Sequence, residues 1–381
     1  MEKLLDGLLI LDFSQFLSGP SCGLRLADLG ARVIKIERDG DGDLCRALYV
    51  SDTKIGDGES TIFHAINRNK ESFSINLKEP ASSTRIKKLI AVADVMLHNF
   101  RPGVMQKLGL DYDTVKQINP DIIYGEISGY GEVGEWKDLP GQDLLLQSVS
   151  GITYLSGSKD DPPIPMGIAV ADILAGTHLG QGILAALYRR QMQGTGALIQ
   201  VSMLESLLDF QFEVLTCFLN DGNELPVRSA VNGAHAYIAA PYGIYKTADG
   251  YIAIAMTPVT QLGELMQVEK LRQYLLPEDW FTKRDEIKAI LKESFAQRNT
   301  TAWLSVLEPA DIWCANVFDY ETLLTQEGYK VLEMEQWVRS GPVKVKTTRC
   351  PVTINGEKIK SHRGAPLLGE DNARIIQEFN L

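Results

Sequence analysis

Short apolar runs alternate with longer, mixed segments through the first two hundred residues. The apolar runs predict buried strands at residues 8–13, 33–37, 72–77, 95–98, 122–127 and 198–202. The intervening segments place apolar residues at helical spacing and predict helices, notably at 22–29, 82–92, 112–117 and from about 172 to 194. Strands separated by helices of this length are typical of βαβ units, so we expect an α/β fold with a mostly parallel sheet.

The pattern changes near residue 220. A polar stretch, Asn220-Asp-Gly-Asn-Glu-Leu-Pro226, predicts a linker. Beyond it, residues 242–255 alternate apolar and polar positions around Asp249-Gly250, which predicts a β-hairpin. Helical patterns at 284–297 and 301–307 follow, and residues 342–353 return to a strand-like texture. The second half therefore predicts a small α+β unit.

Composition narrows the class of protein. A chain of 381 residues exceeds the usual size of one hydrophobic core, which favours two domains. No apolar run approaches about 18 residues, and the N-terminus lacks a signal-peptide pattern, so we expect no membrane association. The five cysteines are scattered and form no CxxC pair, which is typical of reduced thiols in a cytoplasmic protein. A formal net charge of −11 disfavours nucleic acid as a partner.

Several familiar catalytic motifs are missing from the sequence. The turn after the first strand lacks GxGxxG, and the chain carries no Walker loop and no GxSxG elbow. The five histidines show no metal-ligand spacing. We therefore expect no dinucleotide, no bound metal and no serine-hydrolase chemistry.

Asp172 is a lone carboxylate in a run of small and apolar residues, Gly167-Ile-Ala-Val-Ala-Asp172-Ile-Leu-Ala-Gly176. Burying an unpaired carboxylate is costly, so the position needs an explanation. One interpretation is a helix N-cap, in which the side chain accepts backbone N–H groups. The other is a nucleophile at a helix terminus that faces a pocket. The local sequence favours neither interpretation.

Positive residues follow three predicted strands. Arg38 follows the second strand, Lys78 follows the third, and Arg101 follows Asn99-Phe100 after the fourth. Ligands of open α/β sheets bind beyond the carboxyl ends of the strands, where these side chains could converge. The pattern favours a ligand that bears phosphate groups.

At these residues the chain resembles the class III (CaiB/BaiF-type) CoA-transferases. The segments that carry the resemblance lie in order along the chain: Leu11-Asp-Phe13, Ser18-Gly-Pro20, Leu29-Gly-Ala-Arg-Val-Ile-Lys-Ile-Glu-Arg38, Gly42-Asp43, Asn69-Lys70, Ala93-Asp-Val95, Asn99-Phe-Arg-Pro-Gly103, Lys107-Leu-Gly109, Asn119-Pro120, Ser128-Gly-Tyr-Gly131, Ser150-Gly151, Ala171-Asp172 and Ala365-Pro-Leu-Leu-Gly-Glu370. The resemblance is weakest between about 260 and 345.

The resemblance implies an architecture. It implies a Rossmann-like large domain, with a parallel sheet formed from both chain ends, over residues 1–205 and 340–381. It implies a small α+β domain over 229–325, joined to the large domain by linkers at 206–228 and 326–339. It also implies an interlocked homodimer.

The resemblance also implies a site. Asp172 falls on the catalytic aspartate of the family. The CoA nucleotide and phosphates would be held at or near seven positions: Arg38, Leu77, Lys78, Asn99, Phe100, Arg101 and Lys107. The carboxylate would attack an acyl-CoA donor, pass through a mixed anhydride and an aspartyl-CoA thioester, and deliver CoA to a carboxylic acid. CoA is then a substrate, and no permanently bound cofactor is expected.

An alternative within the same fold is a 2-methylacyl-CoA racemase. Racemases of this type are expected to carry a histidine base in a Gly-His-Asp segment, and this chain reads Gly141-Gln142-Asp143. A glutamine cannot exchange an α-proton at neutral pH, which favours the transferase. Five residues are expected in the substrate pocket: Gln15, Leu17, Ser18, Gln142 and His235. For Gln142 and His235, a purely structural role in a loop remains open.

Overall fold

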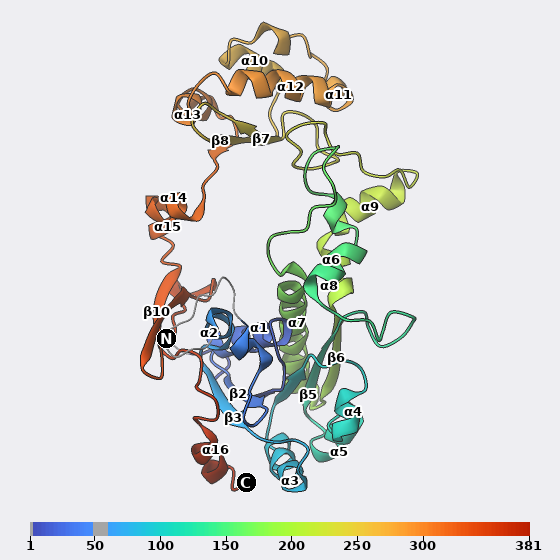
Figure 1. Cartoon of the computed structure of the whole chain (residues 1–381), viewed down its shortest axis with the longest axis vertical. Coiled ribbons are helices and arrows are strands. Elements are labelled where there is room, and N and C mark those ends of the chain that lie inside the picture. The colour runs from blue at the N-terminus through green and yellow to red at the C-terminus, as the bar shows by residue number, and fades with distance from the viewer. Residues whose placement is uncertain (1–2, 49–59) are drawn as a thin grey trace. The chain divides into compact units, whose positions relative to one another are not determined.

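The computed structural model describes residues 3–48 and 60–381. The chain divides into two units, each with its own internal packing (Figure 1). The first unit is formed by Met1–Leu146, Ala169–Phe210 and Val331–Leu381, and the second by Gln147–Ile168 and Gln211–Lys330. The domain limits derived from the sequence stay a prediction.

The first unit contains a six-stranded parallel sheet, which agrees with the expected α/β class. Its strands are β1 (Leu9–Asp12), β2 (Arg32–Glu37), β3 (Lys70–Ser74), β4 (Val95–His98), β5 (Ile123–Ser128) and β6 (Ala197–Ser202). The strand order is β3-β2-β1-β4-β5-β6, and every neighbouring pair is parallel. From β1 the chain adds strands first on one side (β2, β3) and then on the other (β4, β5, β6), so the switch point of the sheet lies between β1 and β4. A crevice for ligands is expected at such a switch point.

Helices cover the sheet and connect its strands. They are α1 (Ser18–Asp28), α2 (Thr61–Asn67), α3 (Pro80–Ile90), α4 (Val104–Leu108), α5 (Tyr112–Ile118), α6 (Asp143–Val149), α7 (Val170–Gln193), α8 (Met203–Phe210) and α16 (Asn372–Glu378), with a 3₁₀ turn η1 (Leu44–Ala47). Helix α1 begins at Ser18, four residues earlier than predicted from the sequence. Pro20 does not prevent this start, because a proline in the first helical turn removes only an N–H that has no partner within the helix.

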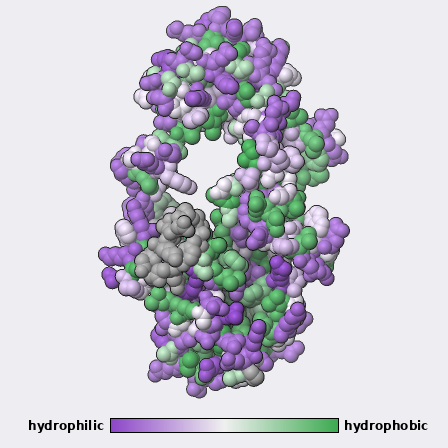
Figure 2. Space-filling model, viewed as in Figure 1, coloured by the Kyte–Doolittle hydropathy of each residue, from purple (hydrophilic) through white to green (hydrophobic). Residues whose placement is uncertain are grey.

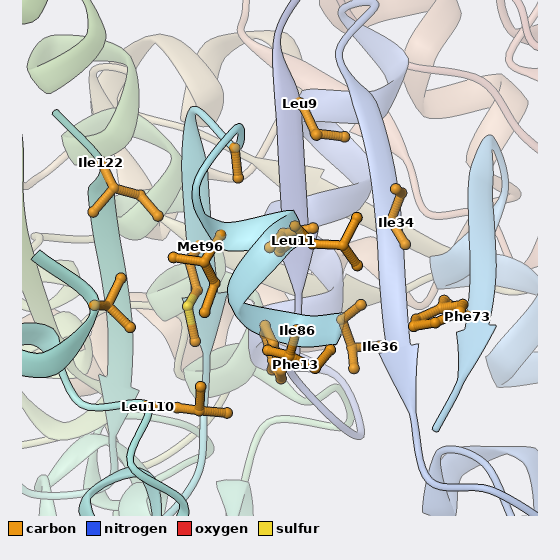
Figure 3. Close-up of a cluster of buried hydrophobic side chains, with 14 of the residues drawn as sticks. Leu9, Leu11, Phe13, Ile34, Ile36, Phe73, Ile86, Met96, Leu110 and Ile122 are labelled. Carbon is orange, nitrogen blue, oxygen red and sulfur yellow. The ribbon is translucent and has the colours of Figure 1, made fainter. Parts of the chain in front are cut away.

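The core of the first unit lies between one face of the sheet and the helices that pack on it. Alternate strand residues such as Leu11, Ile34 and Met96 point to the same face, and Ile86 of α3 packs against them (Figure 3). The neighbouring residue Ile10 is also fully buried. Both faces of the central strands are therefore covered, as parallel sheets require, which explains their continuous apolar runs.

The expectation that both chain ends form the parallel sheet was wrong. The C-terminal segment instead forms two separate antiparallel pairs, β10 (Glu335–Ser340) with β11 (Val343–Thr348) and β12 (Thr353–Ile354) with β13 (Glu357–Lys358). At the edge of the sheet, the backbone N–H groups of Ser72 and Ser74 donate to the side chains of Asp371 and Asn372, each at 2.9 Å. These side chains satisfy the edge strand β3 in place of a seventh strand.

The second unit is α+β, with its own core. The three-stranded sheet has the order β7-β8-β9, formed by Gly243–Lys246, Tyr251–Ile254 and Cys314–Asn316, and the helices are α9 (Phe212–Asn220), α10 (Val259–Leu265), α11 (Pro277–Thr282), α12 (Arg284–Phe295), α13 (Thr300–Leu307), α14 (Tyr320–Thr325) and α15 (Glu327–Lys330). Short 3₁₀ turns lie at Ile152–Tyr154, Glu269–Leu271 and Glu308–Ala310. The hairpin β7–β8 was predicted, whereas β9 was not, because a three-residue strand carries no periodicity.

Helix α7 is the one helix in the described chain that is long and apolar enough to cross a membrane by length and composition. Its buried residues include Ala175, Leu179 and Ile183. They pack against α1 and the sheet, so the apolar composition of α7 is that of a core helix.

Candidate active site

The candidate site is a cavity of about 610 Å³ in the first unit, at the carboxyl ends of the strands. The lining residues come from the loops after β1, β4 and β5, from the region of η1 and α2, and from the starts of α6, α7 and α8: Gln15, Phe16, Leu17, Ser18, Cys45, Leu48, Ile62, Asn99, Phe100, Arg101, Pro102, Ile127, Ser128, Gly129, Lys137, Leu139, Gly141, Gln142, Asp143, Ala169, Asp172 and Met203. Seven of the residues singled out in the sequence besides Asp172 therefore meet in one cavity. They are Gln15, Leu17, Ser18, Asn99, Phe100, Arg101 and Gln142.

The side chain of Asn99 holds the loops after β1 and β4 together at the switch point. Its Oδ1 accepts the backbone N–H of Gln15 at 2.8 Å, and its Nδ2 donates to the carbonyl of Gln15 at 2.7 Å. The same Nδ2 donates to the Oγ of Ser18 at 3.0 Å. Asn99 thereby fixes both the loop and the first residue of α1.

Asp172 lies in the first turn of α7 and does not cap that helix. The N-cap residue is Ala169, and it makes no side-chain capping bond. The backbone N–H of Ala171 donates instead to Oδ1 of Asp143 at 2.7 Å. The N-cap interpretation of Asp172 was therefore wrong, because a different carboxylate satisfies the helix terminus and leaves Asp172 facing the cavity.

The surroundings of Asp172 raise the pKa of its carboxyl group from 3.8 to about 6. Burial is the main cause, and the negative charge of Asp143 adds to it. The hydroxyl and the backbone N–H of Ser18 lower the pKa in part. The result is a carboxylate that is less well solvated than usual, with polar groups of Ser18 beside it, a state suited to nucleophilic attack.

Close packing between α1 and α7 brings Ser18 to Asp172. At Gly176, a Cβ atom would collide with the Oγ of Ser21 and with the carbonyl oxygen of Ser18. Only a residue without a side chain allows the backbones to approach this closely. Gly176, one turn after Asp172, is thus a condition for the contact between Asp172 and Ser18.

A buried network of charges shapes the loop between β1 and α1. The ammonium of Lys70 contacts Oδ2 of Asp12 at 2.8 Å, and the ammonium of Lys35 contacts Oδ2 of Asp43 at 2.8 Å. Lys35 also donates to the carbonyl of Ser14 at 2.8 Å. The pKa of Asp12 is lowered against the effect of its burial, chiefly by the positive charges of Lys70 and then Lys35. Such a network fixes the path of the loop only while every member is present.

Phe16 adopts a left-handed backbone conformation, with φ of 59°, at the edge of the cavity. Its N–H donates to Oδ1 of Asp43 at 3.1 Å, and Asp43 is itself paired with Lys35. A left-handed phenylalanine is rare and is held here by a buried side chain. No sequence pattern singled out Phe16.

A second cavity of about 440 Å³ lies beside the first. Arg38, Leu77 and Lys78, three of the residues expected at the CoA nucleotide, line it. Gln15 and Phe100 line both cavities, so the two adjoin at these residues. Both basic side chains are exposed at its rim.

Two of the residues expected in the site lie elsewhere. Lys107 is exposed on α4, and neither cavity is lined by it, although its neighbour Leu108 lines the second. His235 belongs to the second unit, where its Nδ1 accepts the N–H of Tyr237 at 3.2 Å and its Nε2 lies 3.7 Å from Glu213. These contacts describe a histidine engaged within its own unit.

The structure adds Asp143 and Lys137 to the cavity. Asp143 belongs to the Gly141-Gln142-Asp143 segment that was singled out in the sequence, but its proximity to Asp172 depends on tertiary packing. Lys137 lies in a polar segment whose sequence carries no motif. Within residues 3–48 and 60–381 no three His, Cys, Asp or Glu side chains converge as a metal site would require.

Comparisons with known proteins identify the family. A family model described as CoA-transferase family III matches residues 5–372. The chain is 33% identical over 387 residues to an acetyl-CoA:oxalate CoA-transferase of Acetobacter aceti, covering 98% of this chain and 95% of the relative. It is 30% identical over 386 residues to the human succinyl-CoA:glutarate CoA-transferase, covering 99% of this chain and 86% of the relative.

A solved structure agrees over the full length. A CaiB/BaiF family protein from Brucella suis superposes with a TM-score of 0.83 at 27% identity, covering 100% of both chains. A partly buried carboxylate, Asp172, in a cavity at the switch point of the sheet fits such an enzyme. The chain belongs to the family III CoA-transferases.

Proposed function

We propose that this enzyme transfers CoA from an acyl-CoA thioester to a carboxylic acid through covalent intermediates on Asp172. The observation that carries the proposal is the state of Asp172, which faces the cavity and has a pKa raised to about 6 by burial and by the charge of Asp143. A purely structural aspartate has no need of this arrangement. At neutral pH the carboxylate is ionised and able to attack a carbonyl carbon.

The chemistry proceeds by exchange of acyl groups. An oxygen of Asp172 attacks the donor thioester, the C–S bond breaks, and a mixed anhydride and CoA thiolate form. The thiolate attacks the aspartyl carbonyl of the anhydride, which releases the donor acid and leaves an aspartyl-CoA thioester. An acceptor carboxylate attacks this thioester to form a second anhydride, from which the thiolate returns to the acceptor. Three activated intermediates, two anhydrides and one thioester, replace one difficult exchange, and the last step releases the carboxylate of Asp172.

The amino end of α1 supports the charged steps. Ser18 and Gly19 begin the helix, and their N–H groups have no carbonyl partner within it. N–H groups at a helix terminus stabilise negative charge that develops on a tetrahedral intermediate. The N–H of Ser18 lowers the pKa of Asp172, so this end of α1 lies near the place where the charge would form.

The second cavity is the proposed place for the CoA nucleotide. Arg38 and Lys78 are positioned to contact phosphate groups, and Phe100 and Gln15 connect this cavity to Asp172. Asn99 and Arg101 would line the passage between the two cavities, whereas Lys107 would contribute from the outside of α4. The relatives named above act on oxalate or on succinyl and glutarate groups, so dicarboxylic acids are candidate substrates here.

We also propose that the enzyme is a homodimer, as the class III resemblance implies, and that it works in the cytoplasm. Helix α9 has no buried residue, and its apolar side chains Phe212 and Leu219 are 68% and 61% exposed. Hydrophobic surface is visible at this helix in Figure 2. A second copy of the chain would cover such a surface.

The direct test is to trap the covalent intermediate. The enzyme is incubated with acyl-CoA donors, treated with hydroxylamine or borohydride, digested and mapped by mass spectrometry. Modification of Asp172 is expected, together with loss of turnover but retained CoA affinity in Asp172→Ala. Modification at another residue with normal turnover in Asp172→Ala would overturn the proposal.

One measurement distinguishes the racemase alternative from the proposed CoA-transferase. A racemase would exchange the α-proton of a chiral 2-methylacyl-CoA with deuterium from the solvent. The exposed amide of Gln142 lines the cavity at the position where a base would be required, and an amide does not remove such a proton. We expect no deuterium in recovered acyl-CoA under conditions that support transfer.

A further inference from the structure

The loop between β5 and α6, residues 129–142, is closed at its base by two glycines. A Cβ atom on Gly129 would lie 2.8 Å from the Cα of Gly141, so the two backbones touch. The rings of Tyr130 and Trp136 contact each other edge to face with centroids 6.1 Å apart. The N–H of Leu139 donates to the carbonyl of Trp136 at 2.9 Å, which closes a turn. The loop is therefore braced internally.

Lys137 lies within that turn and lines the cavity that contains Asp172. Its side chain is exposed, and within the described chain no carboxylate lies within 4 Å of its ammonium. Among residues 3–48 and 60–381, the other cation that lines the cavity is Arg101, which follows β4 beside Phe100 and is proposed to contact CoA. Lys137 acts at longer range on Glu132 of the same loop, where its charge partly offsets the raised pKa of that carboxyl group, but no ion pair holds its ammonium in the cavity that contains Asp172.

We propose that Lys137 is a specificity-determining residue that pairs with a second carboxylate on the acyl group or acceptor. This inference rests on the proposed function of the same cavity. While Asp172 reacts with one carboxyl group, a distal carboxylate would contact the ammonium of Lys137. A monocarboxylic acid cannot make this contact and leaves the ammonium to water.

The rest of the cavity fits such a molecule. Phe16, Leu17 and Met203 supply apolar surface, and Gln142 supplies an amide. Asp172 and Asp143 would repel a distal carboxylate, so only the part of the cavity near a cation accepts one. Lys137 provides that cation on a braced loop, where less conformational entropy is lost when the pair forms.

The experiment compares dicarboxylic and monocarboxylic acids as acceptors with one acyl-CoA donor. Initial rates are measured for succinate, glutarate and oxalate against acetate and butyrate. In Lys137→Gln we expect kcat/KM for the preferred dicarboxylate to fall about 10-fold or more, as for a lost charge-assisted contact, with the monocarboxylates little changed. The preference should also weaken as salt concentration rises, because the pair is partly exposed.

Two variants make the result specific. Lys137→Arg keeps the charge and is expected to retain most of the dicarboxylate preference. Lys87→Gln makes the same charge change at an exposed position on α3, outside the cavity, and is expected to leave all rates unchanged. The affinity for CoA should be the same in all three variants and the parent enzyme.

The outcomes separate this inference from the proposed function. A parent enzyme that transfers CoA only to monocarboxylates keeps the function and refutes the role of Lys137. Equal losses for both classes of acid in Lys137→Gln, or no loss for either, also refute it. Absence of transfer with every acid, combined with no adduct on Asp172, refutes the function itself.

Discussion

At the scale of single residues, the proposed chemistry depends on the immediate neighbours of Asp172. Asp143 performs two tasks there, since it satisfies the N–H of Ala171 and places a negative charge near the carboxylate of Asp172. Ser18 acts in the opposite direction, because its hydroxyl and backbone N–H lower the pKa of that carboxyl group. The pKa of Asp172, about 6, is the balance of burial, one repulsive charge and these polar groups.

The two tasks of Asp143 can be separated by substitution. Asp143→Asn removes the charge but keeps an oxygen that can accept from Ala171, so the pKa of Asp172 should fall from about 6 toward 3.8. Since the proposed nucleophile is the ionised carboxylate, the acidic limb of the kcat/KM profile should move to lower pH. Asp143→Ala should move it in the same direction and also lose about 1 kcal/mol of stability with the helix contact. An acidic limb that stays in place in both variants would contradict this account.

Asp172 also lowers the stability of the fold at neutral pH. Because its pKa is about 6 in the folded chain and 3.8 in the reference state, the folded state binds more protons between these values. Stability therefore decreases as pH rises through that window, by at most about 3 kcal/mol. Asp172→Asn should unfold at a higher temperature than the parent enzyme at pH 8 and show little difference at pH 4. Thermal unfolding at the two pH values checks this, and equal differences at both would refute it.

At the scale of elements, the site depends on how closely α1 approaches α7. The loop before α1 is held by Asn99 and by the ion pairs of Lys35 and Lys70, while α7 is held by its contact at Gly176. These contacts bring two helix amino termini together at one carboxylate. Each terminus carries partial positive charge, which favours a bound anion and the ionised nucleophile.

A methyl group at Gly176 should separate the two helices. In Gly176→Ala the Cβ would meet the carbonyl oxygen of Ser18, so α7 has to shift and carry Asp172 away from Ser18. We expect turnover to fall about 100-fold, with about 1–3 kcal/mol of lost stability. Gly180→Ala is the matched control, since its Cβ would find only Sγ of Cys22 at 3.8 Å and alanine favours the helix. Similar losses in both variants would argue against a specific role for Gly176.

At the scale of the whole molecule, the exposed apolar side chains of α9 bear on assembly. Phe212 and Leu219 lie on a helix without a buried residue, whereas the other helices of the second unit include α12 and α13 with well-buried faces. A helix with this composition gains stability by packing on another surface. A partner chain supplies such a surface.

The prediction is a dimer of about twice the 42.2 kDa of one chain. Light scattering after size exclusion measures the mass directly. Phe212→Asp with Leu219→Asp should shift the population toward the monomer, whereas Leu275→Asp, at a side chain that is 74% exposed on the same unit, should not. A monomeric parent enzyme, or a dimer unaffected by the α9 changes, would contradict the proposed interface.

Much of this architecture follows from local sequence alone. The six parallel strands were predicted within a few residues because most of their residues are buried, which produces short apolar-rich runs such as Leu9–Asp12. The family was also readable, since its short motifs lie in the turns after strands, where backbone geometry restricts the residue types. Asp172 was conspicuous because a carboxylate among apolar residues has few structural explanations.

Contacts between distant segments were decided only by the tertiary structure. The sequence left open whether Asp172 caps its helix, and Asp143, from the preceding helix, decides the question by taking the N–H of Ala171. The C-terminal segment carries strand texture, yet it forms separate hairpins, since side chains of Asp371 and Asn372 already satisfy the edge of β3. Lys137 and Phe16 line the cavity because of the conformations of their loops, and no hydrophobic periodicity in the sequence predicts those conformations. Secondary-structure propensity and the buried face of an element can be predicted from neighbouring residues. The pairing of charges and hydrogen-bond donors depends instead on which distant residues the fold brings within a few ångströms.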